Sequence, residues 1–425
     1  MSVIDESNPS PGLASSDFSG DARATTVGGA FREYRDRLRG GDTGSLPAVL
    51  GLVVLAIVFS VLRPDTFPST GNIANLMVQA GAICVLAMGL VPVLLLGDID
   101  LSAGVAGGAS AGVMAILVTD KGLPWYVGVL GALVTGMVIG AVIGTLVARL
   151  GIPSFVVTLA FFLGLQGITL KLIGQGGTVP VRDTVIVGIA NSNLPITAGW
   201  VVAILAIALY AVLSLVRYRS QATAGLVRSP LAVVLLRIAG LAVIVLVITY
   251  VLSLNRAANP NFDLRGIPYV VPVVVVLLVA WTFVFSRTRY GRHIYAIGGN
   301  TEAARRAGIN VTVLRTSVFV ICSGMAALSG IVAASRLNSV TPDAGAGNTL
   351  LYAVGAAVIG GTSLFGGKGK MRDAIVGAFV VAVIANGLGL LNQKADVNYL
   401  VTGFVLLLAA SVDAITRRRR SAAGR

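Results

Sequence analysis

Two carboxylates and a hydroxyl lie between apolar segments, in the stretch Gly97-Asp-Ile-Asp-Leu-Ser-Ala-Gly104. An ionisable side chain at the centre of a membrane span costs about 2.5–3.5 kcal/mol on insertion scales, so such groups usually line a cavity or a transport path. We therefore treat Asp98, Asp100 and Ser102 as candidates for contact with a substrate. The alternative is structural, because Asp100 or Ser102 can cap the Gly-rich helix that follows by satisfying its free N–H groups.

A second group of candidates consists of neutral polar side chains within apolar segments. Amide and hydroxyl groups with few charges nearby suit an uncharged, polyhydroxylated solute. Each of them can instead form a hydrogen bond between helices, worth on average about 0.6 kcal/mol. The candidates of this kind that we assign to the substrate path, beside Asp98, Asp100 and Ser102, are Gln79, Thr158, Gln166 and Asn386.

A basic stretch, residues 287–310, separates two apolar segments and contains the only histidine, His293. Its second half has the signals of a short helix: Asn300 can serve as the N-cap, Glu302 favours the helix dipole, and Gly308 gives a C-terminal stop. About seven helical residues make a rod of roughly 10 Å. We expect this helix to dock on a partner and to transmit motion; the alternative is an amphipathic surface helix. The predicted contact residues are Asn300, Glu302, Ala303, Arg305, Arg306 and Gly308.

The sequence lacks the residue sets typical of an enzyme. A Walker A loop requires Gly-x-x-x-x-Gly-Lys-Ser/Thr to cradle phosphates, and the nearest string, Thr362-Ser-Leu-Phe-Gly-Gly-Lys-Gly369, lacks the first Gly and the final hydroxyl. No Ser/His/Asp set, metal-ligand cluster or catalytic carboxylate pair is recognisable. We therefore expect a non-enzyme that binds no metal or cofactor of its own and takes its energy from a partner.

The elements that must position these residues are membrane spans. Hydrophobic residues make up 56% of the 425 residues and charged residues 12%, whereas a soluble domain carries about 25% charged residues. A helix needs about 20 mainly apolar residues to cross a bilayer. We expect an all-α, polytopic membrane bundle of about 10–12 spans, in which the Gly-rich segments 101–118 and 350–363 are broken or re-entrant. Twelve candidate segments occur, at residues 46–62, 74–96, 101–118, 125–148, 152–173, 199–216, 231–253, 267–286, 312–334, 350–363, 373–391 and 397–415.

The distribution of Lys and Arg predicts the orientation of the chain. If both termini are cytoplasmic, 23 of the 32 Lys and Arg residues fall on cytoplasmic segments, eight fall on external segments and Arg237 lies within a span, in agreement with the positive-inside rule. Orientation thus explains the net charge of +14. The basic residues are scattered between apolar spans rather than gathered with aromatics on one surface, so we expect no nucleic-acid partner.

Two motifs of the form Gly-x-x-x-Gly-x-x-x-Gly, at residues 104–112 and 136–144, place small residues one helical turn apart. Such motifs allow neighbouring helix backbones to approach closely. We expect them to serve helix packing, and the alternative is a thin gate at which helices slide.

Four motifs of the chain resemble those of a known family. Glu302-Ala-Ala-x-x-x-Gly308 is similar to the coupling loop of ABC importer permeases, and its setting, residues 295–305, resembles the ribose, xylose and arabinose branch. Residues 97–104 are similar to that branch's Gly-x-Ile-Asp-Leu-Ser-Val-Gly signature, with Ala in place of Val and with Asp98 where we expect Gly or Glu. The strings 151–159 and 354–368 also look like family strings. The resemblance covers residues 46–415, and the xylose-type permeases are the most similar subgroup.

The resemblance implies a multi-pass permease of the bacterial cytoplasmic (inner) membrane. It also implies a permease homodimer, an extracytoplasmic sugar-binding protein, and two copies of an ABC ATPase that hydrolyses ATP and docks on residues 297–310. The implied cargo is a monosaccharide, D-xylose or a similar pentose or hexose. The expected domains are a cytoplasmic tail (1–45), a permease domain (46–415) with its coupling loop (287–311), and a basic cytoplasmic tail (416–425).

Two alternatives stay open. An ion-coupled secondary transporter would use Asp98 and Asp100 as ion or proton sites. An ABC permease for branched-chain amino acids or nucleosides would keep the architecture and change the cargo. A scaffolding membrane protein is a more distant alternative, because it needs neither the capped cytoplasmic helix nor polar groups on many spans.

Overall fold

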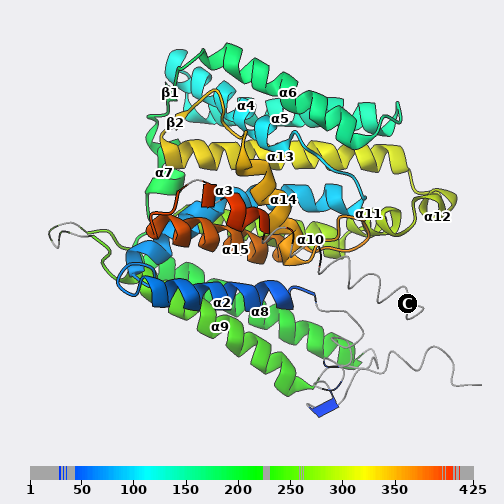
Figure 1. Ribbon diagram of the computed structural model, residues 1–425. Coiled ribbons are helices and arrows are strands. Elements are labelled where there is room, and N and C mark those ends of the chain that lie inside the picture. Colours follow the sequence, from blue (N-terminus) through cyan, green and yellow to red (C-terminus); the bar gives the residue numbers. More distant parts are fainter. Residues whose placement is uncertain are drawn as a thin grey trace, which may run out of the picture. The chain divides into compact units, whose positions relative to one another are not determined.

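The computed structural model describes residues 44–223, 230–257 and 263–394, together with a few isolated residues outside these ranges (Figure 1). The described part is built of α-helices, with one short ladder between β1 (Val179–Pro180) and β2 (Ser339–Val340). Nine of the described helices are long and apolar enough to cross a membrane. The predicted all-α, polytopic membrane fold is therefore confirmed. The predicted tails, 1–45 and 416–425, lie almost entirely outside the described residues.

Eleven of the twelve predicted spans coincide with helices in the described part of the chain. The twelfth, 397–415, lies largely outside the described residues. The helices that match are α2 (Leu46–Leu62), α3 (Thr70–Leu95), α4 (Ala103–Ala115) with the π-helical turn η2 (Ile116–Asp120), α5 (Trp125–Ala148), α6 (Ser154–Ile173), α8 (Ile196–Thr223), α9 (Leu231–Ser253), α10 (Val270–Arg287), α13 (Val311–Leu337), α14 (Asn348–Gly360) and α15 (Met371–Leu390). Three further helices are short: α7 (Thr184–Asn191), α11 (Arg289–Gly299) and α12 (Thr301–Arg306).

Neither Gly-rich segment forms a long, regular α-helix, and a broken or re-entrant path through the membrane stays a prediction for both. The α-helical pattern of α4 ends at Ala115 and continues as the π-helical turn η2. The helix α14 has only 13 residues, which gives about 20 Å, less than the roughly 30 Å of a hydrocarbon core. The segment before α14 packs against α4, since a Cβ atom at Gly104 would collide with the carbonyl oxygen of Gly345.

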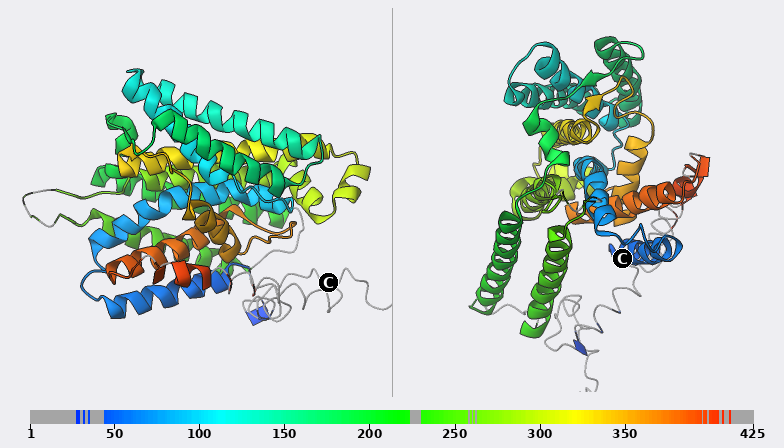
Figure 2. Two further views of the ribbon diagram at one scale, coloured as in Figure 1. Left: turned by 45° about the horizontal axis from the view of Figure 1, so that its top comes forward. Right: turned by 90° about the vertical axis from the view of Figure 1, so that its left-hand side faces the viewer.

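The helix α13 packs against α3, α4 and α5 (Figures 1 and 2). Its contact with α5 depends on the glycines of the second motif. A Cβ atom at Gly144 would lie 2.8 Å from the Cα atom of Thr316, and one at Gly140 would collide with the Phe319 carbonyl oxygen. Backbone therefore meets backbone along this interface, and the motif serves helix packing as predicted.

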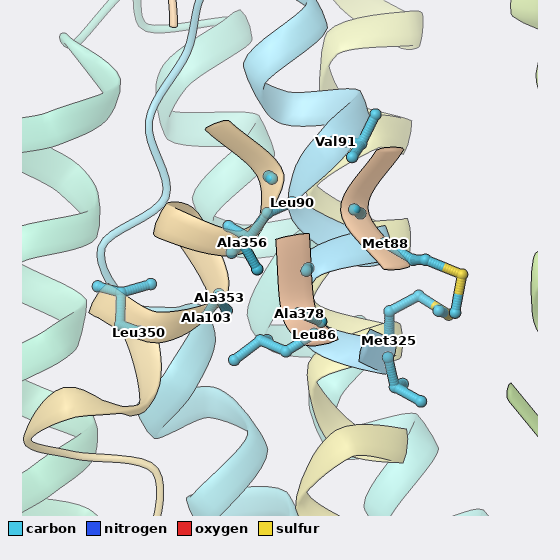
Figure 3. Packing of buried hydrophobic residues seen from close by; sticks show 14 of the residues in the cluster. Leu86, Met88, Leu90, Val91, Ala103, Met325, Leu350, Ala353, Ala356 and Ala378 are labelled. Atoms are coloured by element: carbon cyan, nitrogen blue, oxygen red, sulfur yellow. The ribbon is translucent and has the colours of Figure 1, made fainter. Parts of the chain in front are cut away.

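The apolar core lies where α3, α13, α14 and α15 meet (Figure 3). The helix α3 supplies Leu86, Met88 and Leu90, which are almost completely buried, and α13 supplies Met325. The most apolar stretch of α3 is 78% buried within the chain. The helix α3 is therefore the central helix of this core.

The loops of residues 43–199 and 249–394 collect at two ends of the long helices. At the end that carries α11 and α12, the Gly367 N–H donates to Leu95 O at 2.9 Å, and the Ile99 N–H donates to Ser154 Oγ at 3.3 Å. At the other end β1 pairs with β2. Figure 1 shows α12 on the right and the strands on the left.

The division of the loops between the two ends agrees with the distribution of Lys and Arg among them. The segments at the α12 end include Arg149 and the loops 287–315 and 364–373, which were assigned to the cytoplasm from Lys and Arg, and the connection 97–100 lies at the same end. The segments at the strand end are those assigned to the outside. The structure thus supports the predicted alternation of segments between two sides, while which side faces the cytoplasm stays a prediction.

Residues 200–248, which include most of α8 and α9, form a compact unit of their own. Their apolar side chains are largely exposed, for example Leu205, Leu213, Leu236 and Val243. A helix that is apolar on all sides is typical of a membrane span. These two helices therefore fit a lipid environment.

Candidate functional site

The helix α12 begins with the cap that the sequence predicts. Asn300 Oδ1 accepts a hydrogen bond of 2.9 Å from the Ala303 N–H, which satisfies one of the free donors of the first turn. Glu302 follows in that turn, where its negative charge favours the helix dipole. Six residues are helical rather than about seven, so the rod measures about 9 Å.

The helix α12 also ends as predicted. Gly308 has a φ of +81°, a conformation that favours glycine. Its N–H donates to Arg305 O at 3.0 Å, and the Ile309 N–H donates to Ala304 O at 3.1 Å. This pair of bonds is a Schellman motif, so both ends of a very short helix are fixed by local interactions.

One side chain of α12 anchors it to the rest of the molecule. Ala304 is buried with Ile297 of α11 and Val311 of α13, and Leu96, Ile309 and Leu314 pack against these three. Glu302 and Arg305 form an ion pair of 2.8 Å on the outer side, with side chains 65% and 61% exposed. All six predicted contact residues are exposed. The helix therefore presents a charged surface, and its role in docking stays a prediction.

The helix α11 is an element that the sequence motifs do not predict. It begins with Thr288, whose Oγ1 accepts a hydrogen bond of 3.3 Å from the Gly291 N–H. Gly291, Ile294 and Ile297 are buried at intervals of three residues, while Arg292 is exposed. This spacing in a basic segment is the signal that could have revealed the helix.

A contact between α11 and the α14–α15 connection lies close to α12. Tyr295 Oη donates to Gly369 O at 2.7 Å. Burial, and then the negative charge of Asp373, raise the pKa of Tyr295, so the hydroxyl keeps its proton and stays a donor at neutral pH. Gly298 lies against the end of α3, because a Cβ atom there would collide with Leu95 O and lie 2.9 Å from Gly367 N.

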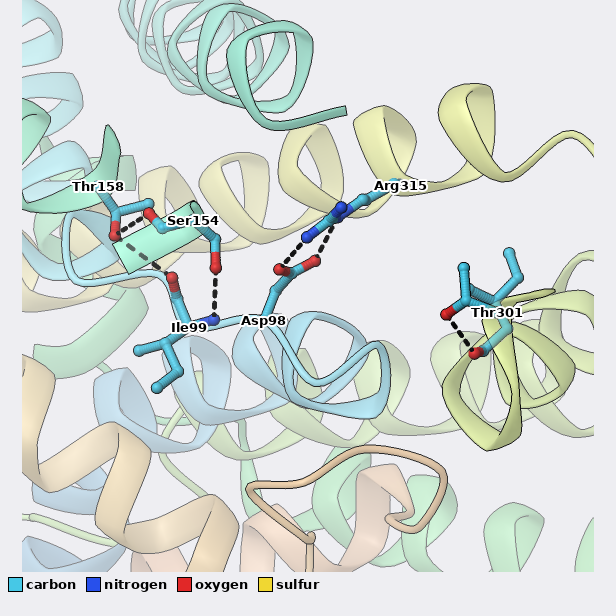
Figure 4. Close-up of polar contacts among 7 residues, drawn as sticks. Asp98, Ile99, Ser154, Thr158, Thr301 and Arg315 are labelled. Carbon is cyan, nitrogen blue, oxygen red and sulfur yellow. Dashed lines mark hydrogen bonds and ion pairs between the residues drawn. The ribbon is translucent and has the colours of Figure 1, made fainter. Parts of the chain in front are cut away.

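Asp98 lies at this same end, in the connection between α3 and α4. It pairs with Arg315 of α13 through two hydrogen bonds, from Nε to Oδ2 at 2.7 Å and from Nη2 to Oδ1 at 2.5 Å (Figure 4). The Asp98 side chain is 5% exposed. Arg315 is a residue that sequence reasoning missed, since it is 217 positions away and no local pattern indicates its partner.

Asp100 holds the N-cap residue of α4, Ser102, while α4 itself has no side-chain cap. Its Oδ1 accepts hydrogen bonds from the Ser102 N–H at 2.9 Å and from Ser102 Oγ at 2.6 Å. Both side chains are buried. Thr158 lies nearby on α6. Its Oγ1 donates to Ser154 O in the same helix at 2.8 Å and lies 3.3 Å from Ile99 O (Figure 4). These residues brace the starts of α4 and α6.

Gln79 and Asn386 come together elsewhere, between α3 and α15. Asn386 exchanges two hydrogen bonds with Asn72, of 3.0 and 2.9 Å, and its Nδ2 is 3.5 Å from Gln79 Oε1. Gln79 lies 16 residues before Leu95 on α3, about 24 Å along the helix. Gln166 is half-buried on α6. The seven predicted path residues thus form two clusters and a separate residue, and contact of any of them with substrate stays a prediction.

A polar cavity of about 380 Å³ lies at the end away from α12. Its volume is within the roughly 300–1,000 Å³ of small-molecule sites. Arg256 borders it and donates from Nη1 to Leu252 O at 2.6 Å and Gly266 O at 3.0 Å, so this arginine also holds its loop. The polar lining consists of Asn75, Asn191, Asn193, Arg256 and Arg336.

The helices and loops define the class of this protein. Among the described residues, nine helices are long and apolar enough to cross a membrane, and α3 is mostly buried, so the chain is a polytopic membrane protein. The profile of the family described as branched-chain amino acid transport system, permease component, matches residues 72–410. The chain belongs to this family of permeases.

Several curated relatives cover most of the chain. It is 36% identical to the xylose transport system permease protein XylH of Escherichia coli K12 over 372 residues, which are 87% of this chain and 92% of the relative. It is 34% identical to XylH of Haemophilus influenzae, over 87% of this chain and 96% of the relative. The ribose import permease protein RbsC of Escherichia coli K12 is 30% identical, over 86% and 92%. No solved structure matches. The resemblance to sugar permeases is confirmed.

Proposed function

We propose that this chain is the membrane-spanning permease of an ATP-driven importer for a monosaccharide, in the bacterial cytoplasmic membrane. The cargo is D-xylose or a similar pentose or hexose. Relatives named as xylose and ribose permeases support this cargo class. The chain forms the translocation path as a homodimer, and an extracytoplasmic binding protein delivers the sugar.

The observation that carries the proposal is the geometry of α12. A helix of six residues is too short to be stable by itself in water, yet here it has side-chain and backbone caps and an exposed charged surface. Its single buried side chain, Ala304, connects it to α11 and α13. A rigid knob of this kind suits docking in a cleft of the partner ATPase.

Displacement of α12 can be transmitted to the long helices through its direct contacts. When the ATPase subunits bind ATP and close, they displace α12 with the start of α13. The contacts of Leu96 and Gly298 carry this displacement to the end of α3, and Tyr295 carries it to the α14–α15 connection. The long helices then rock about one another, and the sugar that entered from the opposite end, where the polar cavity lies, is released to the cytoplasm.

The ion-coupled alternative is less well supported. An ion site needs a carboxylate that is free to coordinate the ion. Asp98 is engaged by Arg315, whereas Asp100 binds Ser102 through Oδ1 only and its buried Oδ2 has no hydrogen-bond partner among the described residues, so this alternative rests on Asp100 alone. Branched-chain amino acids or nucleosides remain a rival cargo because the family profile covers amino acid permeases. Binding assays on the cognate binding protein separate these cargoes from sugars.

The test is the double variant Glu302→Ala/Arg305→Ala in a reconstituted complex. The pair is exposed, so its loss costs at most about 1 kcal/mol of stability, and we expect an inserted permease that neither retains the ATPase nor transports sugar. The matched control is Asp263→Ala/Arg265→Ala, which removes another exposed ion pair of 2.8 Å far from α12. Normal ATPase retention and normal uptake in the α12 variant would sink the proposal.

A further inference from the structure

The ion pair between Asp98 and Arg315 joins two segments with different roles (Figure 4). Arg315 is the fifth residue of α13, in the segment that follows α12. Val311 and Leu314 of the same turn share the apolar cluster that holds Ala304 of α12. The start of α13 must therefore move together with α12.

Asp98 lies in the connection 96–102, which holds the first turns of two helices. The next residue, Ile99, receives a contact from Thr158 Oγ1 on its carbonyl oxygen and donates its N–H to Ser154 Oγ, which ties the connection to α6. Asp100 binds the Ser102 N–H and so fixes the start of α4. Movement of Asp98 must therefore displace both α4 and α6.

The form of the bond suits the transmission of force. Two parallel hydrogen bonds between a guanidinium and a carboxylate fix orientation as well as distance. The Asp98 side chain is 5% exposed and that of Arg315 34%, so separating them would leave a carboxylate buried without its partner, which is strongly unfavourable. In the described part of the chain, this is the one ion pair between the α12–α13 segment and the connection 96–102.

We propose that the Asp98–Arg315 pair is a positioning element that transmits the displacement of α12 to α4 and α6. The inference rests on the proposed function, because it presupposes an ATPase that moves α12. Asp98 then acts on the transport path through α4 and α6 and does not touch the sugar. A carboxylate in an apolar chain is thus explained by mechanical coupling rather than by an ion site.

The test uses the full complex of permease, ATPase and binding protein in proteoliposomes, with xylose as the probe. The variants are Asp98→Asn, Arg315→Gln, the neutral double variant Asp98→Asn/Arg315→Gln, and Arg315→Lys. Sugar uptake and ATP hydrolysis are measured on the same vesicles, together with the amount of ATPase bound. The matched control is Asp263→Asn, which breaks an exposed aspartate–arginine pair at the other end.

We expect the variants to retain the ATPase, because α12 and its caps are intact, and to hydrolyse ATP at a rate close to that of the wild type. The sugar transported per ATP should fall about fivefold or more, the lower bound of typical coupling between sites. Arg315→Lys keeps the charge and loses the bidentate geometry, so it should lie between the wild type and Arg315→Gln. Asp263→Asn should match the wild type.

Three results would overturn the inference in distinguishable ways. An unchanged ratio of sugar to ATP in the neutral double variant would show that the pair transmits nothing. Failure of every variant, including the neutral double variant, to give a folded complex would assign the pair a purely structural role. Wild-type vesicles without ATP-driven uptake would refute the proposed function itself, and the inference with it.

Discussion

Replacing Asn300 with Ala removes the side-chain cap of α12 and leaves the other five predicted contact residues unchanged. The lost hydrogen bond, 2.9 Å to the Ala303 N–H, is worth about 1 kcal/mol. Because six residues form a helix only marginally, this loss acts directly on the helical population of α12. About 1 kcal/mol corresponds to roughly a fivefold change in an equilibrium constant, so we expect the permease to bind its ATPase about fivefold more weakly.

A second substitution extends the series. Gly308 has a φ of +81°, and a side chain in this conformation costs about 1–2 kcal/mol. The double variant Asn300→Ala/Gly308→Ala should therefore lose about 2–3 kcal/mol, or roughly 30- to 150-fold in ATPase affinity. Binding of the purified ATPase to permease in nanodiscs, measured by titration, gives these factors directly.

The matched control is Asn310→Ala. Asn310 Oδ1 caps α13 by accepting a hydrogen bond of 3.1 Å from the Val313 N–H. The Asn310→Ala variant therefore loses the same kind of bond as Asn300→Ala, at a position ten residues further along the chain. The helix α13 has 27 residues and packs against α3, α4 and α5. Tertiary packing rather than the cap stabilises a helix of this kind. The affinity of the Asn310→Ala permease for the ATPase should therefore stay within about twofold of the wild-type value. Equal effects of Asn300→Ala and Asn310→Ala, or no effect of either, would refute the claim that the folded α12 is the docking element.

Three other predictions concern packing and hydrogen bonds. Gly140→Leu on α5 should lower the free energy of unfolding of the permease in detergent by more than about 1–3 kcal/mol, because a Cβ atom there collides with α13. Gly164→Leu on α6 should be tolerated, because nothing lies within 4 Å of a Cβ atom at that position. Equal melting temperatures of the two variants would contradict this prediction. Tyr295→Phe removes the bond to Gly369 O and should cost about 1 kcal/mol of stability and reduce the sugar transported per ATP; an unchanged ratio would exclude this route of coupling. Asn386→Leu should cost about 1–3 kcal/mol, since the side chain of Asn72 loses both of its bonds to Asn386 and keeps the one to Phe67 O. Unchanged melting with a raised KM for sugar would place Asn386 in the path instead.

Much of the fold follows from local patterns that the sequence contains in full. Apolar stretches of about 20 residues mark spans because the bilayer fixes their length. The caps of α12 could be predicted because Asn300 and Gly308 act on atoms only a few residues away. The alternation of loops between the two ends could be predicted from Lys and Arg for a similar reason, since the bias belongs to each loop separately.

The arrangement of the site could not be predicted in the same way. The partner of Asp98 is 217 positions distant, and the pairing depends on how α3 and α13 pack. For the same reason, Gln79 and Asp98 looked like members of one path, although they lie near the middle and beyond the end of a 26-residue helix. The helix α11 was not predicted, because one of its three buried residues is a glycine and the segment is otherwise basic, so its apolar face is short and weakly marked in the sequence.

The most direct measurement is sugar uptake by proteoliposomes that contain the permease, with the ATPase, ATP and binding protein each left out in turn. The account predicts uptake of xylose or a similar monosaccharide only when all three are present, and loss of that uptake in Glu302→Ala/Arg305→Ala. Uptake by the permease alone, driven by an ion gradient and unaffected by the change in α12, would contradict it.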